Sequence, residues 1–354
     1  MLKIKNVSYE RLEFNLSEPY TIAYETVSKS VNFILKIETD TLHVGYGCAA
    51  PDKVVTGETP GDVEKAIVSI IIPFLKEKNA YMTANILEEF KKLLPYRTSA
   101  LAMVDMALSD LMSRKFETPL YKYLGGYRHS IPTSITIGIS SIEDTLKIAE
   151  EYIKQGFFIL KVKGGLIVEE DIEKLTRLRE NFKDIQLRFD GNQGYTVKEA
   201  IAFFEATKHL NIEIFEQPTK EGEDTMLGQV TNKIDIPVMA DESIKTLKDT
   251  FRLAQNGIID MVNIKLMKVG GIREAIYINS VAKSAGLEAM IGCIDECGLG
   301  ISAGLHFALS TKNIQYADLD GHLDLMEDPF KGLFTLHKGV LYPTNSFGLG
   351  SIRL

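Results

Sequence analysis

Cysteine is scarce in this sequence, and tryptophan is absent from all 354 residues. The three cysteines form no Cys-x-x-Cys pair, and an odd number fits neither a disulfide framework nor a zinc site. A long hydrophobic run is also missing, because a serine and a proline interrupt residues 67–75, well short of the ~20 residues of a membrane span. Residues 1–5 lack the apolar core of a secretory signal. We therefore expect a cytoplasmic protein with no membrane segment.

The chain has no surplus of positive charge. Its 40 Lys and Arg residues stand against 48 Asp and Glu residues, for a net charge of −8. This balance is unlike the basic footprint of a nucleic-acid-binding protein. A hydrophobic share of 45% with 25% charged residues is typical of globular proteins, and the length suits one barrel with an addition or two ordinary domains. We expect a small-molecule partner, and neither nucleic acid nor a membrane.

Charged side chains close short apolar runs at nearly even spacing in the second half of the chain. From Lys163 to Asp190, Glu216, Asp241 and Lys265 the steps are 27, 26, 25 and 24 residues. A strand with its crossover helix and loops takes about that many residues. Parallel strands buried on both faces read as continuous apolar runs, and in a barrel of such strands the active site lies at their C-terminal ends. The spacing therefore places these charges at one end of a barrel.

The predicted elements form an α/β barrel of eight strands and seven helices, a (βα)7β modified TIM barrel over residues 126–324. Strands are expected at 133–139, 157–163, 185–190, 212–216, 237–241, 261–265, 288–293 and 314–318. Helices are expected at 142–155, 169–183, 197–209, 224–232, 246–256, 272–285 and 299–310. The eighth helix is missing because a glycine- and proline-rich tail follows the last strand.

The first 125 residues lack this regular alternation of strands and helices. Their pattern predicts an α+β capping domain. Antiparallel strands are expected at 2–14, 31–38 and 42–48, followed by helices at 62–78, 84–94 and 99–115. The tail, residues 325–354, contains a last strand near 339–342 and is expected to return to this domain.

Three carboxylates, those of Asp190, Glu216 and Asp241, follow consecutive strands and are expected to converge. Hard oxygen ligands suit Mg²⁺. Any one of these acids is more often a helix cap or a solvated group. Three in register, with Asn192 and Gln217 beside them, favour a metal site.

Two groups of lysines would flank this metal. Lys161 and Lys163 lie two residues apart, so they share one side of a strand. Lys265 comes from a strand four further round the barrel. Burial and a neighbouring ammonium or dication lower the pKa of a lysine, which then acts as a base. Lys163 alone could equally be a solvated strand end, but opposed lysines suit removal and return of a proton beside a carboxylate.

These motifs together resemble the enolase superfamily, in its muconate lactonizing subgroup, and most of all the dipeptide epimerases. The matching stretches are residues 160–163 (Leu-Lys-Val-Lys), 189–194, 215–218, 239–243 and 263–271. The resemblance extends to the capping domain, whose loops near 19–29 and 54–58 would lie over the site. Nearly the whole chain is covered.

The resemblance implies a mechanism and one Mg²⁺ per subunit, held by Asp190, Glu216 and Asp241. Lys163 and Lys265 would exchange the α-proton of a dipeptide's C-terminal residue from either face, through an enediolate. Lys161 would hold the substrate carboxylate. A lysine base with Mg²⁺ is the general arrangement of enolase-type sites.

Further residues are expected to bind the dipeptide. Asp318 and Asp320 resemble the Asp-x-Asp pair that receives the substrate ammonium away from the metal, although a solvated turn before a glycine would also explain them. Thr136, Cys293 and Asp295 match weaker substrate contacts, and a buried Thr or Cys more often reflects simple packing.

The first lid loop carries Tyr24 where relatives that prefer an acidic second residue resemble one another in carrying an arginine. We therefore expect an apolar or aromatic C-terminal residue in the substrate. Asp295, an extra acid near the ammonium end, could also admit a basic first residue.

Alternatives within the same subgroup are an N-acylamino acid racemase, an o-succinylbenzoate synthase or a cycloisomerase, against which Asp318 and Asp320 argue. A noncatalytic metal-binding barrel is the alternative from another class, and it has no use for two opposed lysines. The resemblance also implies a homo-oligomer.

Overall fold

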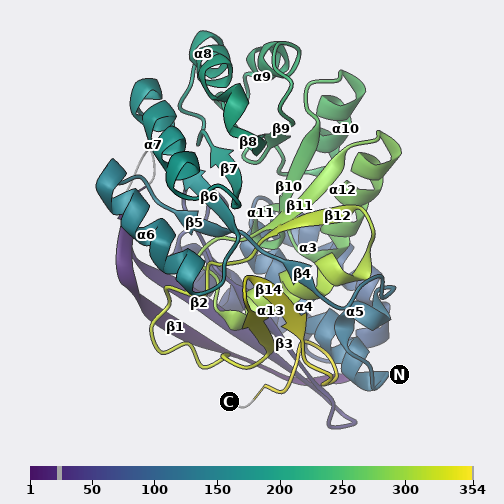
Figure 1. Cartoon of the computed structure of the whole chain (residues 1–354). Helices are drawn as coiled ribbons and strands as arrows, with labels where there is room; N and C mark the ends of the chain where they lie inside the picture. Colours follow the sequence, from purple (N-terminus) through teal and green to yellow (C-terminus); the bar gives the residue numbers. More distant parts are fainter. Residues whose placement is uncertain (22–25, 353–354) are drawn as a thin grey trace.

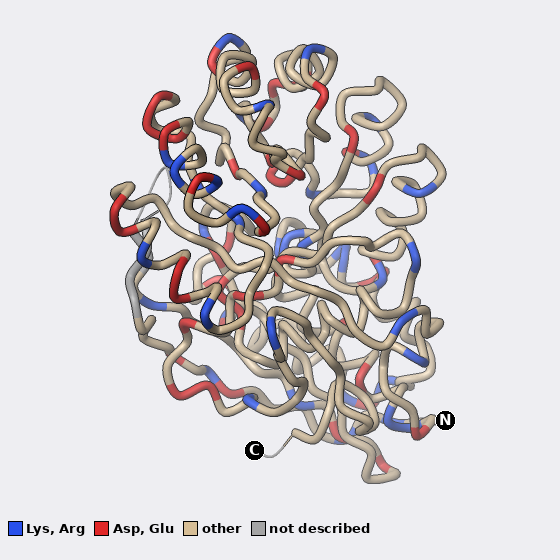
Figure 2. The backbone as a smooth tube through the Cα atoms, viewed as in Figure 1, with Lys and Arg blue, Asp and Glu red and all other residues tan. Residues whose placement is uncertain are grey.

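The computed structural model of the chain describes residues 1–21 and 26–352, with side chains for 1–17 and 28–352. A three-stranded antiparallel sheet with its helices packs beside a barrel of parallel strands (Figure 1). Acidic and basic positions are interspersed along the outer helices (Figure 2). Within the described ranges no helix has the length and apolar character needed to cross a membrane.

The capping sheet is built from long, twisted strands in the order in which they occur in the chain. Its strands are β1 (Ile4–Thr21), β2 (Thr26–Thr39) and β3 (Val44–Ala49). Helix α4 (Thr98–Lys115) lies against β3 and is buried along most of its length. A Cβ on Gly47 would lie only 1.9 Å from the carbonyl oxygen of Met103, so this close approach of helix and strand requires a glycine.

The helix expected at 62–78 differs in the structure. It begins as α1 (Pro60–Ala66), behind a capping box formed by Thr59 and Asp62. It widens into a π-helical turn over Ile67–Ile71 and ends as the short α2 (Ile72–Leu75). Pro73 has no N–H to donate, and the break places it in the first turn of α2, where that donor is not needed. The remaining helices of this part are α3 (Thr83–Leu93) and α5 (Leu120–Tyr123).

The second part confirms the (βα)7β barrel. Its eight parallel strands follow one another in chain order. They are β5 (Ile135–Ile137), β6 (Ile159–Lys163), β7 (Gln186–Asp190), β8 (Ile212–Glu216), β9 (Val238–Ala240), β10 (Met261–Lys265), β11 (Glu288–Gly292) and β12 (Ile314–Asp318).

Seven helices cover the outside of the barrel, as expected, and one short helix was not expected. The seven are α6 (Ile142–Lys154), α7 (Val168–Asn181), α8 (Val197–Thr207), α9 (Asp224–Thr231), α10 (Leu247–Gln255), α12 (Ile272–Ser284) and α13 (Gly298–Ser310). The extra one is α11 (Leu266–Val269), which directly follows β10.

An apolar layer fills the inside of the barrel. Ile214, Met239, Met261 and Met290 are each at most 1% exposed and pack together as a cluster of their own. Ile214 and Met239 lie two residues before Glu216 and Asp241, on the same side of their strands. The layer therefore forms a floor, and the charged residues lie at the C-terminal end above it.

The barrel is not closed by a strand ladder within the described residues, because β5 and β12 form the two edges of the sheet. Side chains close most of this seam, which we define as residues 133–136 and 317–320. Ser134 N–H donates to the carbonyl of Ala317 at 3.0 Å. The other bonds run from Thr136 N–H to Asp320 Oδ2 (2.6 Å), from Leu319 N–H to Thr133 Oγ1 (2.8 Å) and from Ser134 Oγ to Asp318 Oδ1 (2.7 Å). The strand expected at 133–139 is short because these side-chain bonds replace a ladder.

The tail contacts both parts of the molecule. Strands β13 (Phe334–His337) and β14 (Val340–Pro343) form a small antiparallel sheet with β4 (Ile131–Pro132), which leads into the barrel. Further along, Leu349 N–H donates to Asp110 Oδ1 of α4 at 2.7 Å. The strand expected near 339–342 corresponds to β14, whereas β13 was not expected. The division at residues 125, 126 and 324 stays a prediction.

Candidate active site

The carboxylates of Asp190, Glu216 and Asp241 lie at the C-terminal ends of adjacent strands. Asp190 ends β7 and Glu216 ends β8, where the two are partners in register. Asp241 follows β9 directly. Each of the three residues is at most 3% exposed. Buried carboxylates need paired cations or hydrogen-bond donors, and lysines provide them here.

One ammonium gathers three carboxylates. Lys161 Nζ lies 3.1 Å from Asp190 Oδ2, 2.8 Å from Glu216 Oε2 and 2.9 Å from Asp318 Oδ2. Burial alone would lower the pKa of Lys161, but the charges of Asp318, Glu216 and Asp190 raise it well above its ordinary value. Lys161 therefore stays protonated in this arrangement.

Asp241 is held by two further lysines. Its Oδ2 lies 2.6 Å from Lys265 Nζ and its Oδ1 lies 2.5 Å from Lys268 Nζ. Lys268 is 1% exposed and also donates to the main-chain oxygens of Asp241 and Asn263. Burial would raise the pKa of Asp241, but Lys265 and Lys268 hold it well below its usual range. Sequence reasoning did not single out Lys268, which lies in the four-residue helix α11.

Glu216 has a neutral donor as well. Asn263, on β10, donates from Nδ2 to Glu216 Oε1 at 2.7 Å. Burial raises the pKa of Glu216 to about 7, against the opposing charge of Lys161. Asn263 is fully buried, and sequence reasoning did not single it out.

The donor set fits a hard divalent cation. Within the described residues, no three His, Cys, Asp or Glu side chains are grouped to hold a metal as they stand, and the carboxylate oxygens contact lysines. The ammonium of Lys161 contacts both Asp190 and Glu216, so a cation lies between these two carboxylates. The described residues also provide no hydrogen-bond partner for the buried Glu242 Oε2 and Asn192 Oδ1. Several buried oxygens around a cation are what Mg²⁺ requires.

Lys163 and Lys265 stand on opposite sides of these carboxylates. Lys163 ends β6 and Lys265 ends β10, with β7, β8 and β9 between them in the sheet. Lys163 is half-buried and Lys265 is 9% exposed. The lowered pKa expected for a lysine beside a dication stays a prediction, because the carboxylate of Asp241 itself contacts Lys265 in this arrangement. Burial and Lys161 lower the pKa, but Asp241 raises it above its ordinary value.

Asp318 ends β12 and Asp320 follows it, and both residues lie in the seam. Asp318 contacts Lys161, so it adjoins the carboxylates and does not lie away from them as expected. Asp320 Oδ2 accepts the main-chain N–H of Thr136, and its Oδ1 accepts from Cys293 Sγ at 3.8 Å. Burial raises the pKa of Asp320 to about 7, and Asp318 adds to this effect. Thr136 and Cys293 therefore surround Asp320.

The remaining candidates from the sequence are Asp295, Tyr24 and the lid loop 54–58. The main-chain oxygen of Asp295, in the loop after β11, accepts from Ser30 Oγ (2.7 Å) and Asn32 Nδ2 (3.1 Å) of the capping sheet. Tyr24 lies outside the described residues. In the expected lid loop 54–58, Glu58 is fully buried and accepts the N–H of Ser99 at the start of α4. Glu58 therefore stabilises the start of α4.

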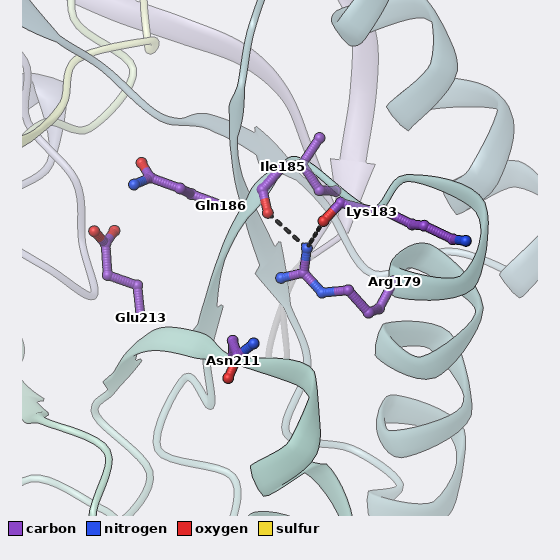
Figure 3. Close-up of a pocket in the computed structure, with 6 residues that line it drawn as sticks. All are labelled: Arg179, Lys183, Ile185, Gln186, Asn211 and Glu213. Carbon is purple, nitrogen blue, oxygen red and sulfur yellow. Dashed lines mark hydrogen bonds between the residues drawn. The ribbon is translucent and has the colours of Figure 1, made fainter.

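A hollow of about 360 Å³ lies at the opposite end of the barrel, beside the beginnings of β7 and β8. Arg179 in this hollow donates to the carbonyls of Lys183 and Ile185 (Figure 3). The rest of the lining is Gln186, Asn211 and Glu213. Because the carboxylates and lysines lie at the other end, we place the active site there.

Comparison with known families gives matches over most of the chain. Residues 6–125 match the N-terminal domain of mandelate racemase / muconate lactonizing enzyme. Residues 144–351 match the enolase C-terminal domain-like family.

Several characterised proteins are similar over their full length. The chain is 40% identical to the L-Lys-D/L-Arg epimerase of Desulforapulum autotrophicum, covering 100% of both. The structure of the substrate-liganded L-Ala-D/L-Glu epimerase of Bacillus subtilis is similar, with a TM-score of 0.96, 37% identity and 98% of each chain covered. The dipeptide epimerase of Enterococcus faecalis, complexed with Mg and L-Leu-L-Tyr, has a TM-score of 0.95 at 38% identity, covering 98% of this chain and 99% of that one.

These findings confirm the resemblance that the motifs of the sequence indicated. The chain belongs to the mandelate racemase and muconate lactonizing enzyme family of the enolase superfamily, within the group of its dipeptide epimerases.

Proposed function

We propose that this protein is a Mg²⁺-dependent dipeptide epimerase. It inverts the α-carbon of the C-terminal residue by 1,1-proton transfer through an enediolate. The observation that carries the proposal is the placement of Lys163 and Lys265 on β6 and β10, with the carboxylate-bearing strands between them. A stereocentre held over those carboxylates has one amine on each face, so one lysine removes the α-proton and the other returns it.

The other charged groups divide the remaining tasks. The Lys161 ammonium lies beside the carboxylates of Asp190 and Glu216. A substrate carboxylate bound over these acids would therefore have this ammonium next to it, where it stabilises the negative charge of the enediolate. Asp190, Glu216 and Asp241 would hold Mg²⁺, which acts as a Lewis acid on the substrate carboxylate when bound. Asp318 and Asp320 would receive the ammonium of the dipeptide. Both carboxylates are held in the seam, Asp318 beside Lys161 and Asp320 against the main-chain N–H of Thr136.

Exchange in heavy water tests the assignment of the lysines. The wild type with Mg²⁺ should incorporate deuterium at the α-position from both epimers of a dipeptide. We expect Lys163→Ala and Lys265→Ala each to exchange only one epimer, and a different one, with epimerisation reduced about 10²- to 10⁴-fold, as for loss of a general acid or base. Lys174→Ala, which removes a buried lysine of α7, is the matched control. If none of the zwitterionic dipeptides tested incorporates deuterium, a noncatalytic barrel is favoured.

We further propose a preference for an apolar or aromatic C-terminal residue. Tyr24 provides no guanidinium for an acidic side chain, and its neighbours Tyr20 and Ile22 are apolar or aromatic. The similar protein of Enterococcus faecalis is named a hydrophobic dipeptide epimerase. Turnover of Ala-Phe and Ala-Tyr should exceed that of Ala-Glu, and Tyr24→Arg should narrow the difference. A clear wild-type preference for Ala-Glu contradicts this proposal.

A basic first residue is the second candidate for the substrate. Asp295 adds an acid two residues after Cys293, whose thiol contacts Asp320. The loop that carries Asp295 is bonded to the capping sheet. The similar protein of Desulforapulum autotrophicum is named an L-Lys-D/L-Arg epimerase. Under this proposal Lys-Phe is turned over better than Ala-Phe, and Asp295→Asn abolishes the difference.

We also propose one Mg²⁺ per subunit, a homo-oligomeric assembly and a cytoplasmic location. Metal titration and light scattering of the purified protein test the first two. The three cysteines carry free thiols, as expected in a reducing compartment.

A further inference from the structure

An arginine lies inside the barrel, beneath the active site. Arg188 is on β7, two residues before Asp190, and is 4% exposed. Its partners in register are Lys161 on β6 and Ile214 on β8. A buried arginine is rare unless its charge and its donors are all satisfied, so its contacts indicate what it does.

The guanidinium of Arg188 joins Glu213 on β8 to the seam. Its Nε donates to Glu213 Oε2 at 2.7 Å, on the side of the hollow at the far end of the barrel. Its Nη1 donates to the carbonyl of Ala317 at 3.0 Å and to Ser134 Oγ at 3.3 Å. The carbon Cζ lies 5.2 Å from the centroid of the Tyr316 ring. Two of these four contacts, Ala317 and Ser134, belong to the seam.

The contact with Ser134 decides where the serine hydroxyl points. Ser134 Oγ has one hydrogen, and both Asp318 Oδ1 (2.7 Å) and the carbonyl of Ala317 (3.3 Å) lie within reach. Arg188 donates to the Ser134 oxygen and also occupies the Ala317 carbonyl. The hydroxyl hydrogen is therefore left for Asp318, at the shorter distance and to the charged acceptor.

Asp318 is thereby fixed from both sides. Its Oδ1 accepts from Ser134 and its Oδ2 from Lys161, so both oxygens have a set direction. A continuous chain of hydrogen bonds runs from Glu213 through Arg188, Ser134 and Asp318 to Lys161.

We propose that Arg188 is a positioning residue for the substrate ammonium site, and that it acts through Ser134 on Asp318. The inference rests on the proposed function, in which Asp318 receives the ammonium of the dipeptide. Arg188 touches neither the substrate nor the reacting atoms. It sets the direction of the Ser134 hydroxyl and so holds the carboxylate of Asp318 ionised and aimed at the ammonium. Ligands that carry an ammonium depend on this chain, and ligands without one do not.

The test compares two ligands that differ only in that ammonium. L-Ala-L-Phe is the dipeptide, and N-propionyl-L-phenylalanine is its des-amino analogue. KM and kcat are measured for the first by deuterium exchange, and the inhibition constant is measured for the second, with Mg²⁺ present throughout. The variants are Ser134→Ala, Arg188→Met and the double variant. Matched controls are Ser302→Ala, a buried serine bonded to the carbonyl of Leu349, and Arg179→Met, an arginine bonded to main-chain carbonyls.

We expect each single variant to raise KM for the dipeptide about 10- to 100-fold, the effect of losing a hydrogen bond to a charged group. The change in kcat should be much smaller, and the inhibition constant of the des-amino analogue should stay that of the wild type. Because both residues act along one chain, the double variant should be no worse than the poorer single variant. The two controls should leave KM unchanged.

Two results would overturn the inference while leaving the proposed function in place. One is an equal loss of affinity for both ligands in Arg188→Met, which marks a purely structural arginine. The other is a double variant whose effect is the product of the single effects, which means that Arg188 and Ser134 act independently. If the wild type itself binds both ligands equally well, the ammonium assignment of Asp318 fails, and the inference fails with it.

Discussion

Replacing Asn263 by leucine should weaken the binding of Mg²⁺. Asn263 Nδ2 donates to Glu216 Oε1 at 2.7 Å, and Asn263 is fully buried. Leucine has nearly the same shape but no donor, so Glu216 keeps only its contact with Lys161 among the bonds described above. Loss of such an outer partner typically costs 10- to 100-fold in metal affinity, which corresponds to about 1.4 to 2.7 kcal/mol.

Calorimetric titration of the metal-free protein with Mg²⁺ gives the dissociation constants of wild type and variant. Asn279→Leu is the matched control, because Asn279 is also a buried asparagine whose Nδ2 bonds a neutral oxygen, that of Thr311, far from the site. The control should lose stability without losing Mg²⁺ affinity. A dissociation constant for Asn263→Leu equal to that of the wild type refutes the reasoning, whereas a wild type that binds no Mg²⁺ refutes the proposed cofactor.

Three further predictions concern neighbouring features. Gly292→Ala should reproduce the loss of Mg²⁺ affinity of Asn263→Leu in the same titration, because the new Cβ would lie 2.5 Å from Asn263 Oδ1 and displace that side chain; unchanged affinity contradicts this. Lys268→Met should lower the free energy of unfolding in urea by about 3 kcal/mol, since it breaks a buried ion pair while Asp241 retains Lys265; a loss below about 1 kcal/mol speaks against a structural role. Burial lowers the pKa of His306 to about 3, so the stability that this neutral histidine contributes is full above pH 6.5 and is lost as the pH falls towards 3. The stability of His306→Asn relative to that of the wild type should therefore rise by about 1.4 kcal/mol per pH unit as the pH falls from 5.5 to 4.5, and parallel stability curves would exclude this.

The barrel and its charged rim could be predicted because both depend on local order in the chain. Each strand is an apolar run, and the residue that ends it lies at the rim by construction. Asp190, Glu216 and Lys265 followed from that rule alone. The same rule says nothing about which lysine contacts which acid, so the triple contact of Lys161 could not be anticipated.

What could not be predicted depends on residues that are far apart in the sequence. The bond between Ser134 and Asp318 joins positions 184 residues apart, and no periodicity reports such a pair. Lys268 lies in a helix of only four residues, too short for a periodic signal. Arg188 occupies an interior position of a strand that otherwise reads as apolar, where its partner Glu213 comes from the next strand.

The way in which β5 and β12 meet has a consequence for redesign of the enzyme. Elsewhere in the barrel, main-chain hydrogen bonds hold neighbouring strands together, so side chains there can change without opening the barrel. Between β5 and β12, two of the four hydrogen bonds described above are accepted by the carboxylates of Asp318 and Asp320. Replacing either aspartate to change what the site binds would also remove a bond that holds the barrel together. A redesigned protein would then need another donor–acceptor pair in place of the bonds to Ser134 and Thr136.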